Sequence, residues 1–242
     1  MTHLKAVSCI ILLSGSMIFG SELDRIISPE IKNDAFSALI TRIAQNEDIS
    51  TILEIGSSSG DGSTEAFVQG ISKNKNHPTL FCMEVSKPRF AALKKRYENV
   101  SNVKCYNVSS VPLEAFPSEN EVRGFYNAVN SNLRQYGCER VLGWLRQDIE
   151  YVKTSQAPQN GIEIIKHENN ITNFDVVLID GSEFTGIAEF KLVYGARFIL
   201  LDDINAFKNY ANYQFLLNDS NYKLIERNIN LRNGYAVFKR VN

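Results

Sequence analysis

Three aspartates that directly follow apolar segments could carry chemistry together. Asp180 comes after residues 174–179, and Asp202 and Asp203 come after residues 198–201. Both segments are short and apolar, which predicts buried strands, and open α/β folds bind ligands at the carboxyl ends of such strands. Converging carboxylates repel one another unless a cation lies among them, and an all-oxygen set suits Mg²⁺. The three aspartates are therefore candidate magnesium ligands; the alternative, that they cap helices and form turns, stays open.

A glycine-rich segment supplies a second candidate site. It begins two residues after Glu54 and spaces its glycines G-x-x-x-G-x-G, whereas the dinucleotide fingerprint is G-x-G-x-x-G. Residues 51–55 predict a strand, and Ser63 or Thr64 is expected to cap a helix that runs to Ile71. A glycine turn between a strand and a helix brings backbone N–H groups close to a ligand. The residues expected around that ligand are Glu54, Gly56, Ser57, Ser58, Gly60, Gly62 and Ser63.

Two further polar residues stand at expected strand ends. Glu84 lies in the strand predicted at residues 79–85, in the twenties of residues past the glycine turn. An acid at that place can accept hydrogen bonds from both hydroxyls of a ribose; the alternative is a surface glutamate. Ser109 directly follows the strand predicted at residues 103–108. The carboxyl edge of the sheet therefore offers a ribose contact at Glu84 and a polar side chain at Ser109.

The glycine turn, the acid before it and the later acids together resemble class I methyltransferases, which use S-adenosylmethionine (SAM). The resemblance covers about residues 50–242 and implies that Glu54 holds the methionine ammonium, directly or through water. It also implies that the three glycines wrap the methionyl and ribose portion. Residues 107–110 stand where such enzymes often contact adenine, with Ser109 in place of a common aspartate. The expected cofactor site also includes Asp180.

Residues 179–181 and 201–203 resemble the metal site of cation-dependent small-molecule O-methyltransferases. The similarity is greatest to the macrocin-type sugar O-methyltransferases and more distant to the catechol type. It implies that Mg²⁺ chelates the acceptor hydroxyl and lowers its pKa, after which the oxygen attacks the SAM methyl in line. Asp180 and Glu183 are the expected catalytic residues, with Glu183 as the base. The chain departs from the family pattern at Ser182, where another acid is usual.

These residues need a sheet that brings strand ends together. Helical spacing of apolar residues predicts a helix at 34–44, and further helices are expected at 88–97 and 210–217. Strands alternate with helices, which predicts a mostly parallel sheet covered on both faces. Residues 222–229 and 235–241, joined by a turn at 232–234, predict an antiparallel C-terminal hairpin. The fold class is α/β: a Rossmann-like, seven-stranded, mostly parallel sheet.

A long segment separates the third and fourth strands. Residues 109–173 exceed a common strand–helix–strand connection of about a dozen or more residues. Helices are expected within it at 122–133 and 140–152, so the domain at 34–242 carries a helical insertion at about 117–160. The insertion could pack on the sheet edge, cover the site as a lid, or form a homodimer contact.

Residues 1–33 form an N-terminal segment outside this domain. Lys5, the apolar residues 6–13 and the small residues 14–16 have the outline of a secretory signal, and the run is too short to span a bilayer. The alternative is a helix or strand packed on the domain. A SAM-dependent enzyme needs a cytosolic cofactor, so a cytoplasmic protein is expected, with secretion or membrane association as the alternative.

The composition restricts the partners and the function. A net charge of −1 over 242 residues argues against a protein that binds nucleic acid by neutralising phosphates, and no membrane partner is expected. The sequence therefore predicts a SAM-dependent methyltransferase that performs Mg²⁺-dependent O-methylation of a hydroxylated small molecule such as a sugar or glycoside. One alternative is a SAM-binding protein without transfer activity that acts through a partner. The other, an NAD-dependent oxidoreductase, is disfavoured by the glycine spacing.

Overall fold

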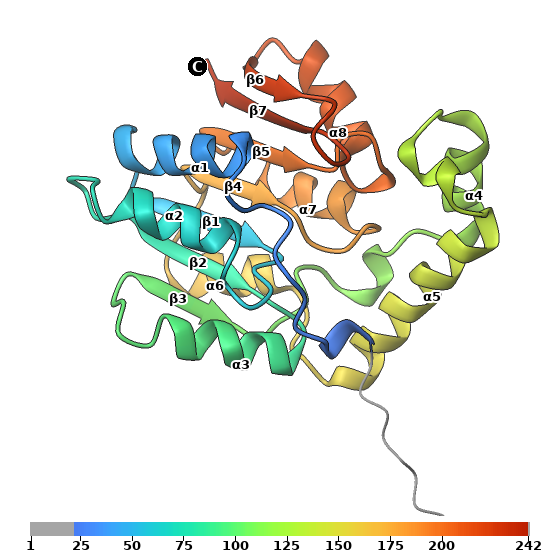
Figure 1. Ribbon diagram of the computed structural model, residues 1–242, viewed down its shortest axis with the longest axis horizontal. Helices are drawn as coiled ribbons and strands as arrows, with labels where there is room; N and C mark the ends of the chain where they lie inside the picture. The colour runs from blue at the N-terminus through green and yellow to red at the C-terminus, as the bar shows by residue number, and fades with distance from the viewer. Residues whose placement is uncertain (1–21, 242) are drawn as a thin grey trace, which may run out of the picture.

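The computed structural model describes residues 22–241, which form one mixed sheet with helices on both sides (Figure 1). The signal-like residues 5–16 lie outside this range. Within residues 22–33 only a 3₁₀ turn, η1 (Glu22–Asp24), is regular, so this part of the N-terminal segment forms neither the helix nor the strand of the alternative interpretation. Among residues 22–241, no helix combines the length and the apolar character that a membrane crossing requires.

The sheet has seven strands in the order β3-β2-β1-β4-β5-β7-β6. The first five strands pair in parallel, and the last two pair antiparallel with each other and with β5. This confirms the predicted seven-stranded, mostly parallel sheet with its antiparallel C-terminal hairpin. The strands are β1 (Thr51–Ile55), β2 (Thr79–Met83), β3 (Val103–Tyr106), β4 (Val176–Ile179), β5 (Phe198–Asp202), β6 (Tyr222–Asn228) and β7 (Tyr235–Arg240).

Two apolar layers cover the sheet, because both faces of each central strand are apolar. In β1, Ile52 packs with one helical layer and Leu53 with the other, as strand alternation requires. The first layer is formed by α1 (Ala35–Asn46), α2 (Ser63–Ile71) and α3 (Lys87–Arg96). The second layer is formed by α6 (Gly161–Glu168), α7 (Gly186–Val193) and α8 (Phe207–Asn218). Sequence periodicity missed α6 and α7, both of only eight residues.

Side-chain caps fix some of these helices, but not the helix after the glycine turn. Asp34 begins α1 with a capping box to Ser37, which matches the predicted start of that helix. The prediction that Ser63 or Thr64 caps α2 is wrong, because Gly62 holds the N-cap position and no side chain caps the helix. The Thr64 hydroxyl instead donates to Glu54.

The insertion between β3 and β4 lies over the carboxyl ends of the strands. It contains η2 (Leu113–Ala115), α4 (Glu119–Ala128), η3 (Asn132–Gln135) and α5 (Cys138–Ser155). Val122 of α4 and Leu142 of α5 pack with Phe184 and Phe207, which follow β4 and β5. The insertion therefore covers the loops at this end of the sheet and does not pack on a sheet edge, as Figure 1 shows for α4 and α5.

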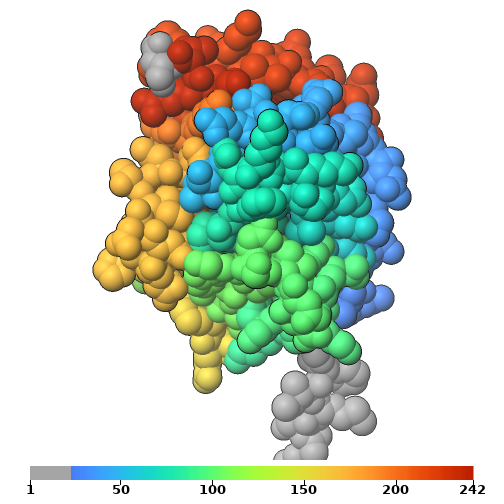
Figure 2. Space-filling view, turned by 90° about the vertical axis from the view of Figure 1, so that its left-hand side faces the viewer, coloured from blue at the N-terminus to red at the C-terminus, as the bar shows by residue number. Residues whose placement is uncertain are grey.

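The amino ends of the parallel strands lie on the opposite side of the molecule from the insertion (Figure 1). Figure 2 views the molecule from the amino ends of the parallel strands, with the C-terminal residues (red) above the blue and teal residues of the α1 and α2 region. The contact between α1 and α2 is close because a Cβ atom on Gly70 would lie 2.5 Å from the carbonyl oxygen of Thr41. Because the insertion lies over the carboxyl ends of the strands, that edge of the sheet is where a ligand can be enclosed.

Candidate functional site

The glycine turn between β1 and α2 is shaped by contacts within the protein. Gly56 has a φ of +91°, and a Cβ atom there would lie 2.1 Å from the backbone oxygen of Asp180. Gly60 has a φ of +79°, and its Cβ position lies 2.7 Å from Leu93. Positive φ favours glycine at both places, and the close approach of the Asp180 backbone leaves no room for a side chain at Gly56. Gly56 thereby brings the end of β1 against the end of β4, while Gly60 packs on α3 and does not line the cavity described next.

A cavity of about 400 Å³ lies at the carboxyl edge of the sheet. It joins the glycine turn to the ends of β2, β3 and β4 and to the acidic residues after β5. The insertion and the N-terminal segment 23–31 complete its wall. Of the residues predicted from sequence, those that line it are Gly56, Ser57, Ser58, Gly62, Ser63, Glu84, Ser109, Asp180, Glu183 and Asp203.

Glu54 lies beneath the glycine turn and not in the wall of the cavity. Its side chain is fully buried and does not line the cavity. One carboxylate oxygen, Oε2, accepts hydrogen bonds from Ser57 Oγ at 2.6 Å and Thr64 Oγ1 at 2.7 Å, whereas Oε1 has no partner. Burial raises the pKa of the Glu54 carboxyl. Glu54 therefore ties the two ends of the glycine turn together from below and does not face the cavity directly. A water-mediated contact with the methionine ammonium stays a prediction.

Glu84 occupies the predicted place at the end of β2 and faces the cavity. Its Oε2 accepts a hydrogen bond from the Ser58 backbone N–H at 2.9 Å, and its Oε1 accepts from the Ser86 N–H at 2.7 Å. Burial raises the pKa of this carboxyl, and the two backbone donors oppose that rise. The residue is 7% exposed, so it is not the surface glutamate of the alternative interpretation. Its position between the turn and the β2–α3 loop fits a residue that receives ligand hydroxyls.

The three aspartates converge as predicted, and the chain bends to allow it. Neighbouring side chains on a strand point to opposite faces, but Asp203 has a φ of +58° directly after β5. The carboxylate oxygens of Asp180, Asp202 and Asp203 therefore lie within 4.8 Å of one another. Asp180 and Asp203 line the cavity, and Asp202 lies behind them, 1% exposed.

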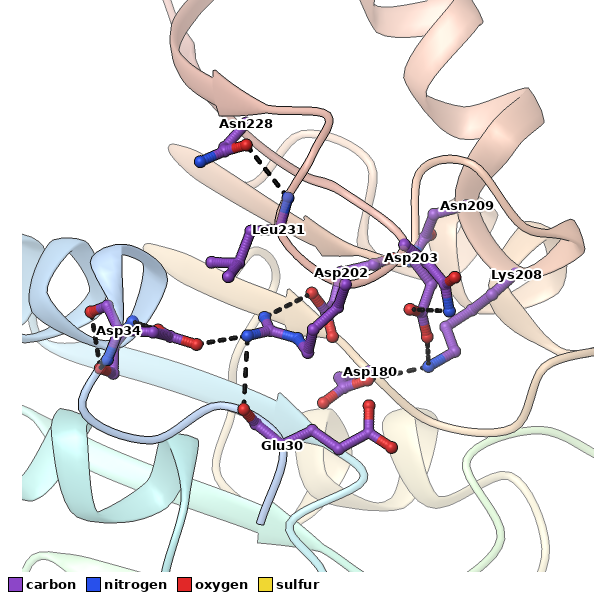
Figure 3. A network of polar contacts seen from close by, with 12 residues as sticks. Glu30, Asp34, Asp180, Asp202, Asp203, Lys208, Asn209, Asn228 and Leu231 are labelled. Carbon is purple, nitrogen blue, oxygen red and sulfur yellow. Dashed lines mark hydrogen bonds and ion pairs between the residues drawn. The ribbon is translucent and has the colours of Figure 1, made fainter. Parts of the chain in front are cut away.

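Two cations that the sequence analysis missed neutralise this acidic cluster (Figure 3). Lys208 Nζ, in the first turn of α8, lies 2.8 Å from Asp180 Oδ1 and 2.7 Å from Asp203 Oδ2. Arg232, in the β6–β7 turn, lies 3.1 Å from Asp202 Oδ1 and also pairs with Asp34. Only tertiary contacts bring these side chains to the aspartates, and no local sequence signal marked them.

Burial and the ion pairs act in opposite directions on the pKa values of the cluster. Burial raises the pKa of Asp180 well above its usual value although Lys208 opposes this, and burial with the charge of Asp203 raises that of Asp202 to about 6. Burial also acts to raise the pKa of Asp203, but the charge and hydrogen bond of Lys208 outweigh it and the pKa is lowered. The surrounding carboxylates raise the pKa of Lys208 against the effect of its burial. Lys208 is therefore a fixed positive charge and not a proton acceptor.

The insertion and the segment after β4 add two further carboxylates to this end of the cavity. Asp148 of α5 accepts a hydrogen bond from Ser182 Oγ at 2.5 Å, and no described residue donates to its other oxygen. Glu183 accepts a weak bond from the Lys208 backbone N–H at 3.3 Å, and burial raises its pKa to about 7. Sequence reasoning identified Glu183 but missed Asp148, because nothing local shows that α5 turns this side chain toward the sheet.

The N-terminal segment is fixed across the other side of the cavity. Asp24 Oδ1 accepts hydrogen bonds from Tyr151 on α5, at 2.5 Å, and from Ser86 after β2, at 2.9 Å. Residues 23–31 thereby connect the insertion to the Glu84 loop. The interpretation of the insertion as a cover over the site agrees with this geometry; the homodimer contact stays a prediction.

The comparisons with known proteins bear on the fold. No protein-family model and no curated protein sequence matches the chain. Among solved structures, a cofactor-bound protein, Rv0187 from MTB, aligns with a TM-score of 0.52 at 13% identity over 90% of this chain and 84% of that chain. An O-methyltransferase from Bacillus cereus in complex with SAH aligns with a TM-score of 0.51 at 13% identity over 87% of this chain and 83% of that chain.

A third solved structure has a similar match. It is a Staphylococcus aureus protein provisionally described as a caffeoyl-CoA O-methyltransferase, with a TM-score of 0.51 at 13% identity over 87% of this chain and 85% of that chain. At such identity the likeness concerns the fold. The chain therefore has the Rossmann-like fold of class I methyltransferases, as the resemblance of its motifs implied.

Removal of Lys208 should destabilise the protein in a pH-dependent way. Lys208→Met leaves Asp180 and Asp203 without their cation, so we expect a loss of about 3–5 kcal/mol in unfolding free energy at pH 7. Lys208 lowers the pKa of both aspartates, so both pKa values should be higher in the variant. As the pH falls toward about 5, protonation of these aspartates should therefore reduce the difference in unfolding free energy between the variant and the wild type. Urea unfolding at both pH values measures this.

Lys239→Met is the matched control for that substitution. Lys239 pairs with Glu47 at 3.0 Å and is 36% exposed, so its loss should change the unfolding free energy by less than about 1 kcal/mol at either pH. A Lys208→Met variant as stable as this control would show that Lys208 does not neutralise the cluster.

Proposed function

We propose that the protein is a SAM-dependent methyltransferase that transfers the methyl group to a hydroxyl of a small molecule. The observation that carries the proposal is that a single cavity joins Glu84 and the glycine turn to the acidic cluster around Asp180. One end thus offers a place for a nucleoside, and the other offers charged groups suited to a reacting hydroxyl. The fold and the SAH complex of the Bacillus cereus structure support this assignment.

The cofactor is proposed to lie along the carboxyl edge of the sheet. Glu84 would accept the ribose hydroxyls beside its two backbone donors, which a carboxylate with several lone pairs can do. The methionyl part would lie over the turn that contains Ser57, Ser58 and Ser63, and adenine would extend toward Ser109. This placement leaves the SAM methyl facing Asp180, where the strands β1 and β4 come together through Gly56.

The acceptor is proposed to lie between the acidic cluster and the insertion. Asp148 and Glu183 face this part of the cavity, and neither forms an ion pair with a described residue. Carboxylates of this kind accept hydrogen bonds from hydroxyl groups. A polyhydroxylated acceptor such as a sugar or glycoside, the class that the macrocin-type resemblance implies, matches such a surface. Glu183, whose pKa is about 7, is suited to take the hydroxyl proton near neutral pH.

The acidic cluster fits a divalent cation by residue type and by spacing. Asp180, Asp202 and Asp203 would hold Mg²⁺, which prefers carboxylate oxygens. Asp180 Oδ2 and Asp202 Oδ2 accept no hydrogen bond from any residue between 22 and 241, whereas Lys208 bonds Asp180 Oδ1 and Asp203 Oδ2. A bound Mg²⁺ would supply a positive charge that lowers the pKa of the acceptor hydroxyl.

The chain's own residues would then orient the reaction. Glu183 takes the hydroxyl proton, the acceptor oxygen forms a bond to the methyl carbon, and the bond from that carbon to sulfur breaks to leave neutral SAH. Lys208 keeps Asp180 and Asp203 in place throughout. The insertion limits the access of water to the acceptor end. Most of the rate enhancement would come from orientation of the oxygen, carbon and sulfur in line.

Replacement of Glu84 tests the cofactor end. Glu84→Ala removes the acceptor of two ribose hydroxyls, so we expect SAH binding to weaken by roughly 1.5–3 kcal/mol, as for lost charge-assisted hydrogen bonds. Isothermal titration calorimetry measures this. The control is Glu65→Ala, which removes an exposed carboxylate on α2 that pairs with Lys32. This variant should bind SAH as the wild type does. An unchanged affinity in Glu84→Ala would remove Glu84 from the site.

The pH dependence of turnover tests the proposed base. Only the ionised carboxylate of Glu183 can take a proton, so kcat should rise with pH through about 7 and then level off. Glu183→Gln should lower kcat by at least about 100-fold and remove that inflection, while SAH affinity stays unchanged. Initial-rate measurements of SAH release with an accepted substrate provide the profile. An identical inflection in the variant would assign the base to another group.

Chelation tests the metal. If the acidic cluster holds Mg²⁺, excess EDTA should abolish methyl transfer and leave SAH binding within about 3-fold of its original affinity, because the ion would contact the acceptor and not the cofactor. Added Mg²⁺ should restore turnover. Full activity in EDTA would instead assign the neutralisation of the cluster to Lys208 and Arg232 alone, and the SAM-dependent activity would stand without a metal.

A further inference from the structure

A buried glutamate lies below the floor of the cavity and takes no part in the proposed reaction. Glu189, on α7, is 0% exposed. Its Oε1 accepts hydrogen bonds from Ser110 Oγ at 2.6 Å and from Thr185 Oγ1 at 2.7 Å, and its Oε2 has no partner. The backbone packs closely over it, because a Cβ atom on Gly181 would lie 2.8 Å from Oε1. Burial of a carboxyl group costs free energy, so the position of Glu189 calls for a functional explanation.

The two hydrogen bonds have a fixed direction. A hydroxyl group has one proton to donate and two lone pairs with which to accept. Ser110 and Thr185 both line the cavity, and both protons are committed to Glu189 Oε1. Burial raises the pKa of Glu189; as a carboxylate, or with its proton on Oε2, the group only accepts through Oε1. The half-buried Ser110 hydroxyl can therefore offer a ligand only a lone pair.

Ser109, next to Ser110, also presents a hydrogen-bond acceptor at this end of the cavity. Ser109 Oγ donates its proton to the backbone oxygen of Val111 at 2.8 Å. The N-terminus of α6 holds the loop in place through the backbone. Gly161 N–H donates to the backbone oxygen of Ser109 at 2.8 Å, and Ile162 N–H donates to the backbone oxygen of Ser110 at 3.3 Å. Neither serine hydroxyl is free to donate to a ligand without losing a bond inside the protein.

We propose that Glu189 is a positioning residue that makes Ser110 an obligate hydrogen-bond acceptor for the exocyclic amine of the SAM adenine. The proposal rests on the proposed function. Along the carboxyl edge, Glu84 follows β2 and Asp180 follows β4, whereas Ser110 follows β3 on the other side of β2. With the ribose at Glu84 and the methyl toward Asp180, adenine extends toward Ser110. The amine at position 6 is the hydrogen-bond donor of adenine, and an acceptor that cannot donate selects it over a 6-oxo group.

The test compares two cofactor products that differ in this group. SAH carries the 6-amino group, and S-inosylhomocysteine carries a 6-oxo group. Wild-type protein should bind SAH at least about 10-fold more tightly, the size expected when a hydrogen bond is replaced by two opposed lone pairs. Isothermal titration calorimetry of both compounds gives the ratio of dissociation constants. If Glu189 had a purely structural role, its replacement would weaken the binding of both compounds alike and leave this ratio unchanged.

Three variants separate the contributions. Glu189→Met frees the Ser110 proton, so the preference for SAH should fall to within about 3-fold. Glu189→Gln should keep the wild-type ratio, because its amide oxygen can accept from both hydroxyls in place of Oε1. Ser110→Ala should lose the preference as Glu189→Met does. Since Ser110 is only half-buried, this variant keeps the test available even if Glu189→Met does not fold.

The outcomes distinguish this inference from the proposed function. Loss of preference in Glu189→Met and Ser110→Ala, with retention in Glu189→Gln, supports the inference. Equal binding of the two compounds by the wild type, or an unchanged ratio in Ser110→Ala, overturns it while SAM binding stands. Wild-type protein that binds neither compound overturns the proposed function itself, and the inference with it.

Discussion

The site depends on the neutralisation of carboxylates that the sheet forces together. Asp180 and Asp202–Asp203 end neighbouring strands, and the left-handed bend at Asp203 turns both members of the pair inward. Without a cation these charges would separate the strand ends. Lys208 provides one from α8 and Arg232 provides another from the hairpin turn. Three segments distant in sequence are thereby held around one edge of the sheet.

The same contacts extend to the cover of the cavity. Arg232 also pairs with Asp34, the N-cap of α1, and donates to the Glu30 backbone oxygen. Glu30 belongs to the segment that lines the cavity, and Figure 3 shows its backbone oxygen in the same polar network as Asp34 and Asp202. The acidic cluster therefore influences both ends of the site: it forms the acceptor end, and through Arg232 it fixes the segment that lies over the cofactor end.

Two buried glutamates share a second arrangement. Glu54 and Glu189 each use one carboxylate oxygen to accept from two hydroxyl groups, and each leaves the other oxygen without a partner. Both lie outside the cavity wall and hold hydroxyl-bearing residues that line it or support the glycine turn. Such buried networks are rigid when their bonds are made. The hydroxyls are thus oriented before a ligand arrives.

Much of the fold could be predicted from the sequence, because strand ends and apolar runs are local features. The seven strands, the hairpin and the convergence of the aspartates follow from such runs. The partners of those aspartates do not, since Lys208 and Arg232 reach them only through tertiary packing. The place of Glu54 could have been predicted: Ile52 and Glu54 share a face of β1, which packs against α1 and α2 and away from the cavity.

A crystal structure of the protein with bound SAH tests the central claim most directly. We expect the ribose hydroxyls within hydrogen-bond distance of Glu84, the adenine beside Ser110, and the sulfur facing Asp180 and Lys208. SAH in the reverse orientation, or outside the cavity that joins these residues, would contradict the account.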